Sequence, residues 1–249
     1  MIRFIFMALF LVPVYMISLP LYVYHALLRR KNPEKSAKQA QTFVVWALHT
    51  LVRMSGASVI VQGLENVPED QPVLYVGNHR SIFDIIIGYK YVKNNTGFVA
   101  KDSLEKTPLV GRWMKYINCL FLNRTDIKEG LKTILHGIEL VKHGTSIFIF
   151  PEGTRSEGDE LLPFKEGSLK IAEKGGCLII PVAITGTENI FEKQFPRVRK
   201  TTVVYEFGKP VDLKSLDKET KKHAGAYVRD IIINMRNQHE NIIAKTGKK

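Results

Sequence analysis

The chain has 249 residues, of which 45% are hydrophobic and 24% are charged, which are ordinary values for a globular protein with a sizeable core. Its formal net charge of +12 points to an anionic partner: a nucleic acid, an acidic lipid surface or a phosphorylated substrate. The two cysteines, Cys119 and Cys177, lie apart in apolar runs and exclude a disulfide-rich framework. We therefore expect buried thiols in a reducing compartment.

The first 28 residues are almost wholly apolar from Ile2 onwards, with Arg3 near their start and a basic cluster at 29–31. As a helix this segment would be roughly 40 Å long, which is enough to cross a bilayer. Pro13 and Pro20 would kink it, and membrane helices tolerate such kinks. It has no small-residue cleavage site, and the larger basic cluster follows it, so we expect the rest of the chain on the cytoplasmic side of the cell membrane.

A second apolar stretch covers residues 43–52 and is too short to span a bilayer. It fits an interfacial helix or an ordinary core helix, and the sequence does not distinguish the two. The two stretches fit either a hairpin held in one leaflet or a true membrane crossing. We expect residues 1–55 to form membrane-anchoring helices and residues 56–249 to form a separate folded domain.

From Gly56 onwards, short β-prone runs alternate with helical patterns. Apolar residues recur at helical spacing over 126–142, a basic helical stretch covers about 215–243, and we expect residues 245–249 to be frayed. This alternation predicts an α/β fold: a mixed, largely parallel sheet flanked by helices, preceded by a two-helix membrane motif. The expected strands are 58–61, 73–76, 97–100, 119–122, 146–150, 177–184 and 201–207.

The segment NHRSIFD at 78–84 follows a predicted buried strand and opens a predicted helix. His79 could take a proton from a hydroxyl group, and Asp84 could orient its imidazole. On a straight helix the two residues would lie about 140° apart, so they meet only if His79 lies in the turn and Asp84 reaches back. The alternative is a surface histidine beside a helix cap.

The segment FPEGTRS at 150–156 leaves another predicted strand in the same way. Gly153 allows a close approach of the backbone to a ligand, the amides near Thr154 could bind anionic oxygens, and Arg155 offers a planar fork for phosphate. The alternative for Arg155 is a surface salt bridge. Further positive charge is available from Arg124, Lys101 and Lys165.

Together these residues resemble the glycerolipid acyltransferase family, specifically the 1-acyl-sn-glycerol-3-phosphate acyltransferases of the PlsC type. The family's four blocks occur in order as NHRSIFD at 78–84, FLNR at 121–124, FPEGTRS at 150–156 and IPVA at 180–183. The resemblance covers residues 56–208, and the two N-terminal apolar stretches resemble the family's two-helix membrane motif.

The resemblance implies that His79 is the general base on the sn-2 hydroxyl of lysophosphatidic acid and that Asp84 holds the imidazole. The acyl donor would be acyl-CoA or acyl carrier protein loaded with an acyl chain, and the product would be phosphatidic acid. The implied phosphate-binding residues are Arg124, Glu152, Gly153, Thr154, Arg155 and Lys101.

We expect no metal and no cofactor beyond the acyl donor, and a membrane phospholipid surface as a partner. Three alternatives stay open: another acceptor such as glycerol 3-phosphate, a non-enzymatic lipid-binding protein, and a nucleic-acid-binding protein. Against the last, the sequence has no helix-turn-helix, zinc-finger or RNA-recognition motif, so we expect no nucleic acid.

Overall fold

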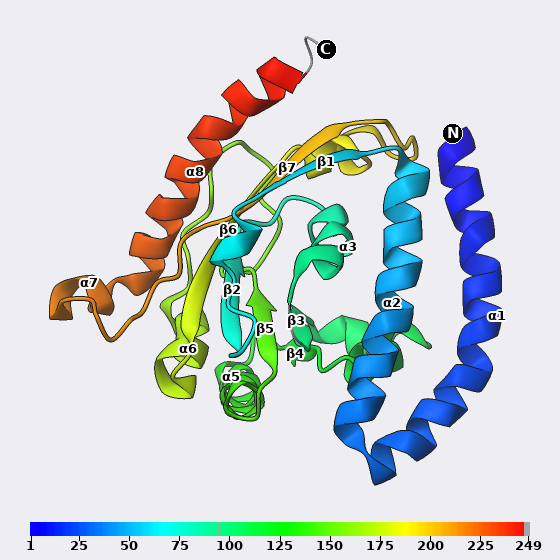
Figure 1. Ribbon diagram of the computed structural model, residues 1–249, viewed down its shortest axis with the longest axis horizontal. Coiled ribbons are helices and arrows are strands. Elements are labelled where there is room, and N and C mark those ends of the chain that lie inside the picture. Colours follow the sequence, from blue (N-terminus) through cyan, green and yellow to red (C-terminus); the bar gives the residue numbers. More distant parts are fainter. Residues whose placement is uncertain (94, 247–249) are drawn as a thin grey trace.

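The computed structural model describes residues 1–93 and 95–246. It begins with an antiparallel helical hairpin of α1 (Ile2–Lys31) and α2 (Pro33–Ser55), which lies along one side of the molecule (Figure 1). Asn32 separates the two helices, and its side chain accepts a hydrogen bond from the Lys35 N–H at 2.9 Å. Pro33 suits the first turn of a helix because it has no N–H to satisfy. Because of these local signals, α2 begins ten residues before the apolar stretch from which we predicted a helix.

Helix α1 leaves most of its apolar side chains exposed and is the one described helix that is long and apolar enough to cross a membrane. Only 6% of its most apolar 18-residue window is buried. It packs along α2, and it also contacts the rest of the protein through aromatic pairs: Tyr22 packs edge-on against Tyr116 at 5.8 Å between ring centroids, and Phe4 stacks on Phe191 at 5.8 Å.

The inner face of helix α2 packs into the hydrophobic core. Ala40 and Val52 belong to the hydrophobic core, and Ala47 and Leu51 are also buried. Of the two interpretations of this stretch, burial therefore favours the core helix, although Trp46 on the outer face is 49% exposed. Gly56, in the left-handed conformation with φ of 74°, ends the helix two residues before the first strand.

The sheet has the strand order β1-β7-β6-β2-β5-β3-β4 among the residues described. Strands β2 to β6 run in one direction, whereas β7 is antiparallel to β6 and β1 is parallel to β7. The predicted mixed, largely parallel sheet is therefore confirmed. The strands are β1 (Ser58–Gln62), β2 (Val73–Gly77), β3 (Thr96–Lys101), β4 (Leu120–Leu122), β5 (Ser146–Ile149), β6 (Leu178–Thr185) and β7 (Thr202–Phe207).

Helices cover both faces of this sheet, as predicted (Figure 1). One core packs α2, α3 and α4 against the sheet, and the other packs α5, α6 and α8 against the opposite face. The remaining helices of the described chain are α3 (Ile82–Tyr91), α4 (Val110–Tyr116), α5 (Ile127–Lys142), α6 (Lys170–Gly175), α7 (Lys218–Lys222) and α8 (Ala224–Thr246).

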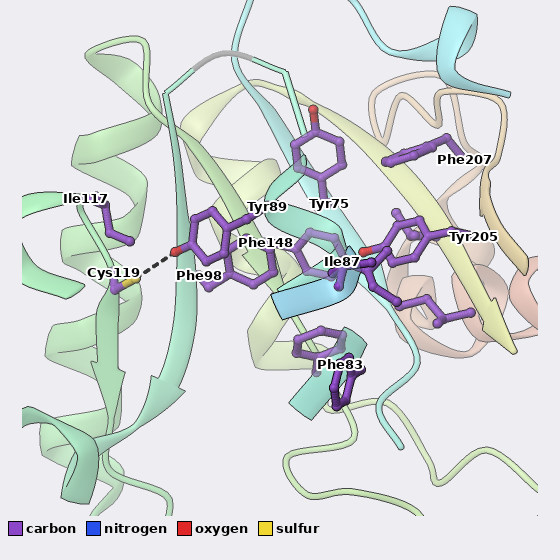
Figure 2. Packing of buried hydrophobic residues seen from close by; sticks show 14 of the residues in the cluster. Tyr75, Phe83, Ile87, Tyr89, Phe98, Ile117, Cys119, Phe148, Tyr205 and Phe207 are labelled. Carbon is purple, nitrogen blue, oxygen red and sulfur yellow. Dashed lines mark hydrogen bonds between the residues drawn. The ribbon is translucent and has the colours of Figure 1, made fainter. Parts of the chain in front are cut away.

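The central strands are largely apolar because both of their faces are covered. All five residues of β2 are buried. Figure 2 shows the aromatic part of the first core, in which Phe148 stacks on Tyr75 at 5.6 Å and on Phe98 at 4.7 Å between ring centroids. This continuous burial fixes the ends of β2 and β5 relative to each other.

Three features differ from the sequence predictions. The short helices α4 and α6 were not expected, and the expected helix over 215–243 is divided into α7 and α8 at His223. Of the segment expected to be frayed, residues 245 and 246 belong to α8, and the other three lie outside the described residues.

Candidate active site

The carboxyl ends of β2, β3, β4, β5 and β6 meet at one edge of the sheet, where ligands bind in open α/β folds. Strands β2 and β5 are neighbours, with Val76 paired to Ile149. Continued past the strand ends, this register sets His79 opposite Glu152. The first and third motifs, which the sequence placed at two strand ends, therefore meet at this edge.

His79 lies in the turn before α3, and Asp84 reaches back to it from the first turn of the helix. The Nδ1 of His79 lies 2.8 Å from Asp84 Oδ2. Ser81 is the N-cap, and its hydroxyl accepts a hydrogen bond from the Phe83 N–H while Asp84 accepts one from the Ser81 N–H, which forms a capping box. Because His79 lies in the turn before the helix, it can meet Asp84, although the two would lie on different sides of a straight helix. The predicted contact between His79 and Asp84 is confirmed.

Asp84 is fully buried and accepts hydrogen bonds at both of its oxygens. Oδ2 also accepts from the Arg80 N–H at 2.7 Å, and Oδ1 accepts from the Thr187 hydroxyl at 2.5 Å. A buried carboxylate needs such donors, because an unpaired charge in the interior is costly. These donors stabilise its negative charge and hold it in one orientation towards the imidazole.

The His79 ring is fixed on its face as well as on its edge. It stacks on Phe150 at 4.2 Å between ring centroids, and the side chain is 13% exposed. An ionised Asp84 can only accept a hydrogen bond, so Nδ1 carries the proton of the neutral imidazole. The lone pair then lies on Nε2, where the ring can act as a base.

The third motif is bonded directly to the turn that carries His79. The Ser156 N–H donates to the His79 carbonyl at 2.9 Å. Gly153 has φ of 74°, and a Cβ there would lie only 3.0 Å from Lys165 Nζ. The left-handed backbone at Gly153 favours glycine, and the Lys165 ammonium group lies against this turn, which brings it to the site.

The resemblance implied that Glu152 binds phosphate, and in this structure its carboxylate faces the protein backbone instead. Its carboxylate is buried and accepts the His79 N–H at 2.7 Å and the Leu162 N–H at 2.9 Å. Burial raises its pKa, and these two backbone donors oppose the rise. The side chain is thus committed to holding the His79 backbone. The Gly153 N–H is also in use, since it donates to the Phe150 carbonyl at 3.1 Å.

Arg155 and Thr154 are exposed beside this site. Arg155 Nη1 lies 3.1 Å from Glu192 Oε1, so the guanidinium forms an ion pair with a residue far along the chain. Both sequence interpretations of Arg155 thus remain compatible with the structure: it forms a salt bridge, and it also lies next to the turn that carries His79.

Lys101 and Arg124 lie at the same edge but further along it. Lys101 ends β3, and Arg124 follows β4, which are the second and third strands from β2 in this direction. At about 4.8 Å per strand, the two positions are displaced by roughly 10 and 14 Å from the end of β2. Burial lowers the pKa of the Arg124 guanidinium, an effect that the nearby Asp102 opposes.

Several contacts around the site were not predicted from the sequence. Asn78 exchanges two hydrogen bonds with the Ile184 backbone, at 2.8 and 2.9 Å, and so ties the first motif to β6. The buried Arg80 guanidinium lies 3.2 Å from both Glu188 and Asp159.

Both cysteines are buried away from the first and third motifs, and burial raises the pKa of the Cys119 and Cys177 thiols to about 11. Among the described residues, no cluster of three or more histidine, cysteine or acidic side chains could hold a metal ion.

A model of the acyltransferase family matches residues 58–185, which is just over half of the chain and contains all the motif residues above. The chain belongs to the acyltransferase family. A 1-acyl-sn-glycerol-3-phosphate acyltransferase of Borreliella burgdorferi is 32% identical over 72% of each chain. One of Saccharomyces cerevisiae is 30% identical over 74% of this chain and 62% of its own length.

The fold of this acyltransferase is similar to a solved structure over nearly its full length. The crystal structure of the 1-acyl-sn-glycerophosphate acyltransferase PlsC from Thermotoga maritima matches with a TM-score of 0.73 and 28% identity, covering 96% of this chain and 98% of that one. The match includes the N-terminal hairpin as well as the α/β domain, because so little of either chain is left out.

Proposed function

We propose that this acyltransferase transfers an acyl group from a thioester to the sn-2 hydroxyl of 1-acyl-sn-glycerol 3-phosphate and forms phosphatidic acid. The observation that carries the proposal is the contact between His79 Nδ1 and Asp84, which leaves Nε2 as a base at an edge that also presents cationic side chains. The relatives described above are named for this acceptor, which supports the choice of substrate.

In the proposed reaction, His79 Nε2 takes the hydroxyl proton while the hydroxyl oxygen attacks the thioester carbonyl. Asp84 stabilises the imidazolium that forms, because its charge lies 2.8 Å from Nδ1. The tetrahedral intermediate then breaks its C–S bond, the new ester is released, and the thiolate receives the proton from His79. A thioester is already an activated acyl group, so this sequence of steps needs no further cofactor. The donor is acyl-CoA or an acyl carrier protein.

The phosphate of the acceptor would be held by Arg155, with Lys165, Lys101 and Arg124 adding positive charge. A guanidinium binds a phosphate through two parallel hydrogen bonds, which orients as well as attracts it. Orientation of the reacting hydroxyl can lower the barrier by up to roughly 7–11 kcal/mol. In this scheme the anchored phosphate brings the hydroxyl to His79.

A test of this function compares acyl-CoA and acyl carrier protein as donors, each with lysophosphatidic acid, glycerol 3-phosphate and lysophosphatidylcholine as acceptors. We expect the fastest turnover with lysophosphatidic acid. His79→Ala should lower kcat by about 10²- to 10⁴-fold, the usual contribution of a general base. His136→Ala, which removes an exposed histidine on α5, is the matched control and should retain activity. Normal turnover by His79→Ala would refute the assigned base, and another preferred acceptor would refute the substrate.

We also propose that α1 inserts into the lipid layer that contains the substrate, with the catalytic domain on the cytoplasmic side. The exposed apolar side chains of α1 and the basic cluster at 29–31 support this arrangement. The net charge of +12 would add attraction to an anionic lipid surface.

This membrane contact can be tested without disturbing the core, because Leu9, Val12 and Met16 are 59%, 59% and 61% exposed. Changing all three to serine should lower the bound fraction in flotation with phosphatidylglycerol vesicles by at least about tenfold, since each apolar side chain contributes roughly 1.5–3 kcal/mol when buried. The matched control changes three exposed residues of α5, Ile127, Leu131 and Leu135, to serine. Equal binding by the α1 variant and wild type would place the anchor elsewhere, and protease protection in oriented vesicles tests the cytoplasmic side.

A further inference from the structure

Glu192 belongs to a short 3-10 turn, η5 (Glu192–Gln194), and places its carboxylate at the beginning of α3. Oε1 accepts the Ile82 N–H at 2.7 Å, and Oε2 accepts the Ser81 hydroxyl at 2.7 Å. Oε1 also lies 3.1 Å from Arg155 Nη1. Three groups from the first and third motifs therefore converge on one carboxylate that is more than a hundred residues away from Ser81 in the sequence.

The surroundings of this carboxylate are those of an anion-binding position. The Ile82 N–H is the first of α3, and the beginning of a helix carries partial positive charge. The Ser81 hydroxyl and the Arg155 guanidinium add two further donors, one of them charged. Ser81 follows His79 by two residues, so the position belongs to the same turn as the proposed base. The carboxylate of Glu192 is bound there as an anion would be.

A substrate phosphate cannot bind these groups while Glu192 occupies them. Two anions at one position repel each other, and Arg155 Nη1 is already paired with the carboxylate. Resting on the function proposed above, we propose that Glu192 occupies the position of the acceptor phosphate in the empty enzyme and that the phosphate displaces it. Glu192 then sets how strongly a phosphate monoester must bind before Arg155 becomes available.

The geometry allows this exchange without rearrangement of the fold. Glu192 reaches the site only through its side chain, which is 23% exposed, so rotation about its side-chain bonds returns the carboxylate to water. The backbone of the turn keeps its own contacts: the Gln194 N–H donates to the Phe191 carbonyl at 3.0 Å, and Phe191 stacks on Phe4. The phosphate would replace the carboxylate at Arg155, Ser81 and Ile82, so no donor there is left unpaired.

Glu192→Gln tests the proposal because glutamine keeps the size and one acceptor oxygen of the side chain but removes its charge. With a saturating thioester donor, we expect the KM for lysophosphatidic acid to fall at least threefold and kcat to stay within twofold. Inhibition by inorganic phosphate should strengthen by a similar factor, which separates the phosphate group from the lipid that carries it. Glu139→Gln, which breaks the exposed ion pair with Lys142, is the matched control and should change neither constant.

An unchanged or increased KM for lysophosphatidic acid in Glu192→Gln would overturn the proposal and make Glu192 a structural brace. Combining Glu192→Gln with Arg155→Ala provides a second check, since the effect on KM should become smaller when the contested guanidinium is absent and competition is left only at Ser81 and Ile82. Calorimetric titration of each variant with inorganic phosphate needs no turnover. If Glu192→Gln binds inorganic phosphate more tightly than the wild type, the exchange is supported, whether or not the wild type transfers an acyl group. Lack of acyl transfer by the wild type would refute only the proposed function.

Discussion

The two ends of the catalytic edge differ in how firmly they hold their polar side chains. Beside β2 and β5, His79 is fixed through its ring nitrogen, its ring face and its backbone, and Asp84 has donors at both oxygens. Beside β3 and β4, Lys101 and Arg124 are exposed at the ends of long side chains. One end is held by individual hydrogen bonds, and the other presents charged side chains that are exposed at the surface.

This difference matches the two tasks that the proposed reaction sets. Proton transfer requires a base held within hydrogen-bond distance of one hydroxyl, so loss of a single supporting contact should be costly. Attraction of an anionic headgroup acts over a longer distance and tolerates movement of the charged groups. We therefore expect substitutions at the two ends to differ in both the size and the kind of their effect.

The largest effect is expected from Asp84→Asn at the end beside β2 and β5. An amide cannot balance the charge of the imidazolium, so kcat should fall by about 10²- to 10⁴-fold with little change in the KM for lysophosphatidic acid. Steady-state kinetics of the purified protein measures both constants. Asp217→Asn removes the charge of another helix-capping carboxylate, at α7, and serves as the control. A wild-type kcat in Asp84→Asn would remove the orienting role.

A smaller effect is expected from Arg155→Ala and Arg124→Ala, measured side by side. A hydrogen bond to a charged group contributes roughly 1.5–3 kcal/mol, so Arg155→Ala should raise the acceptor KM by about 10- to 100-fold. Arg124 lies further along the edge, and its loss should raise that KM about fivefold or less. Arg53→Ala, on the exposed end of α2, controls for lost positive charge. A larger effect at Arg124 would place the phosphate over β3 and β4 instead.

The predictable parts of this molecule are those set by local pattern. Continuous apolar runs predicted the buried strands, because both faces of a largely parallel sheet are covered. The turn and cap at 78–84 could be inferred because His79 and Asp84 meet only in that geometry. The start of α2 was missed, since the decisive signals, Asn32 and Pro33, lie outside the apolar stretch.

The contacts that complete the site could not be predicted in this way. Thr187 and Glu192 lie more than a hundred residues from the first motif, and neither stands in a pattern that indicates a ligand. Glu152 was assigned to phosphate because its motif resembles that of the family, but its buried carboxylate faces the backbone of His79 and Leu162. Such long-range hydrogen bonds depend on strand order and register, which no short stretch of sequence specifies.

The connection between α2 and β1 limits how far the helical hairpin can move relative to the sheet. Only Gly56 and Ala57 lie between these elements, and α2 packs against the same core as Phe83 and Ile87 of α3. Tilting the hairpin relative to the sheet would expose apolar side chains on both. In the arrangement proposed above, the depth of α1 in the lipid would therefore set the height of His79 above it, and a lysophospholipid would have to rise or bend by a fixed amount to reach the base.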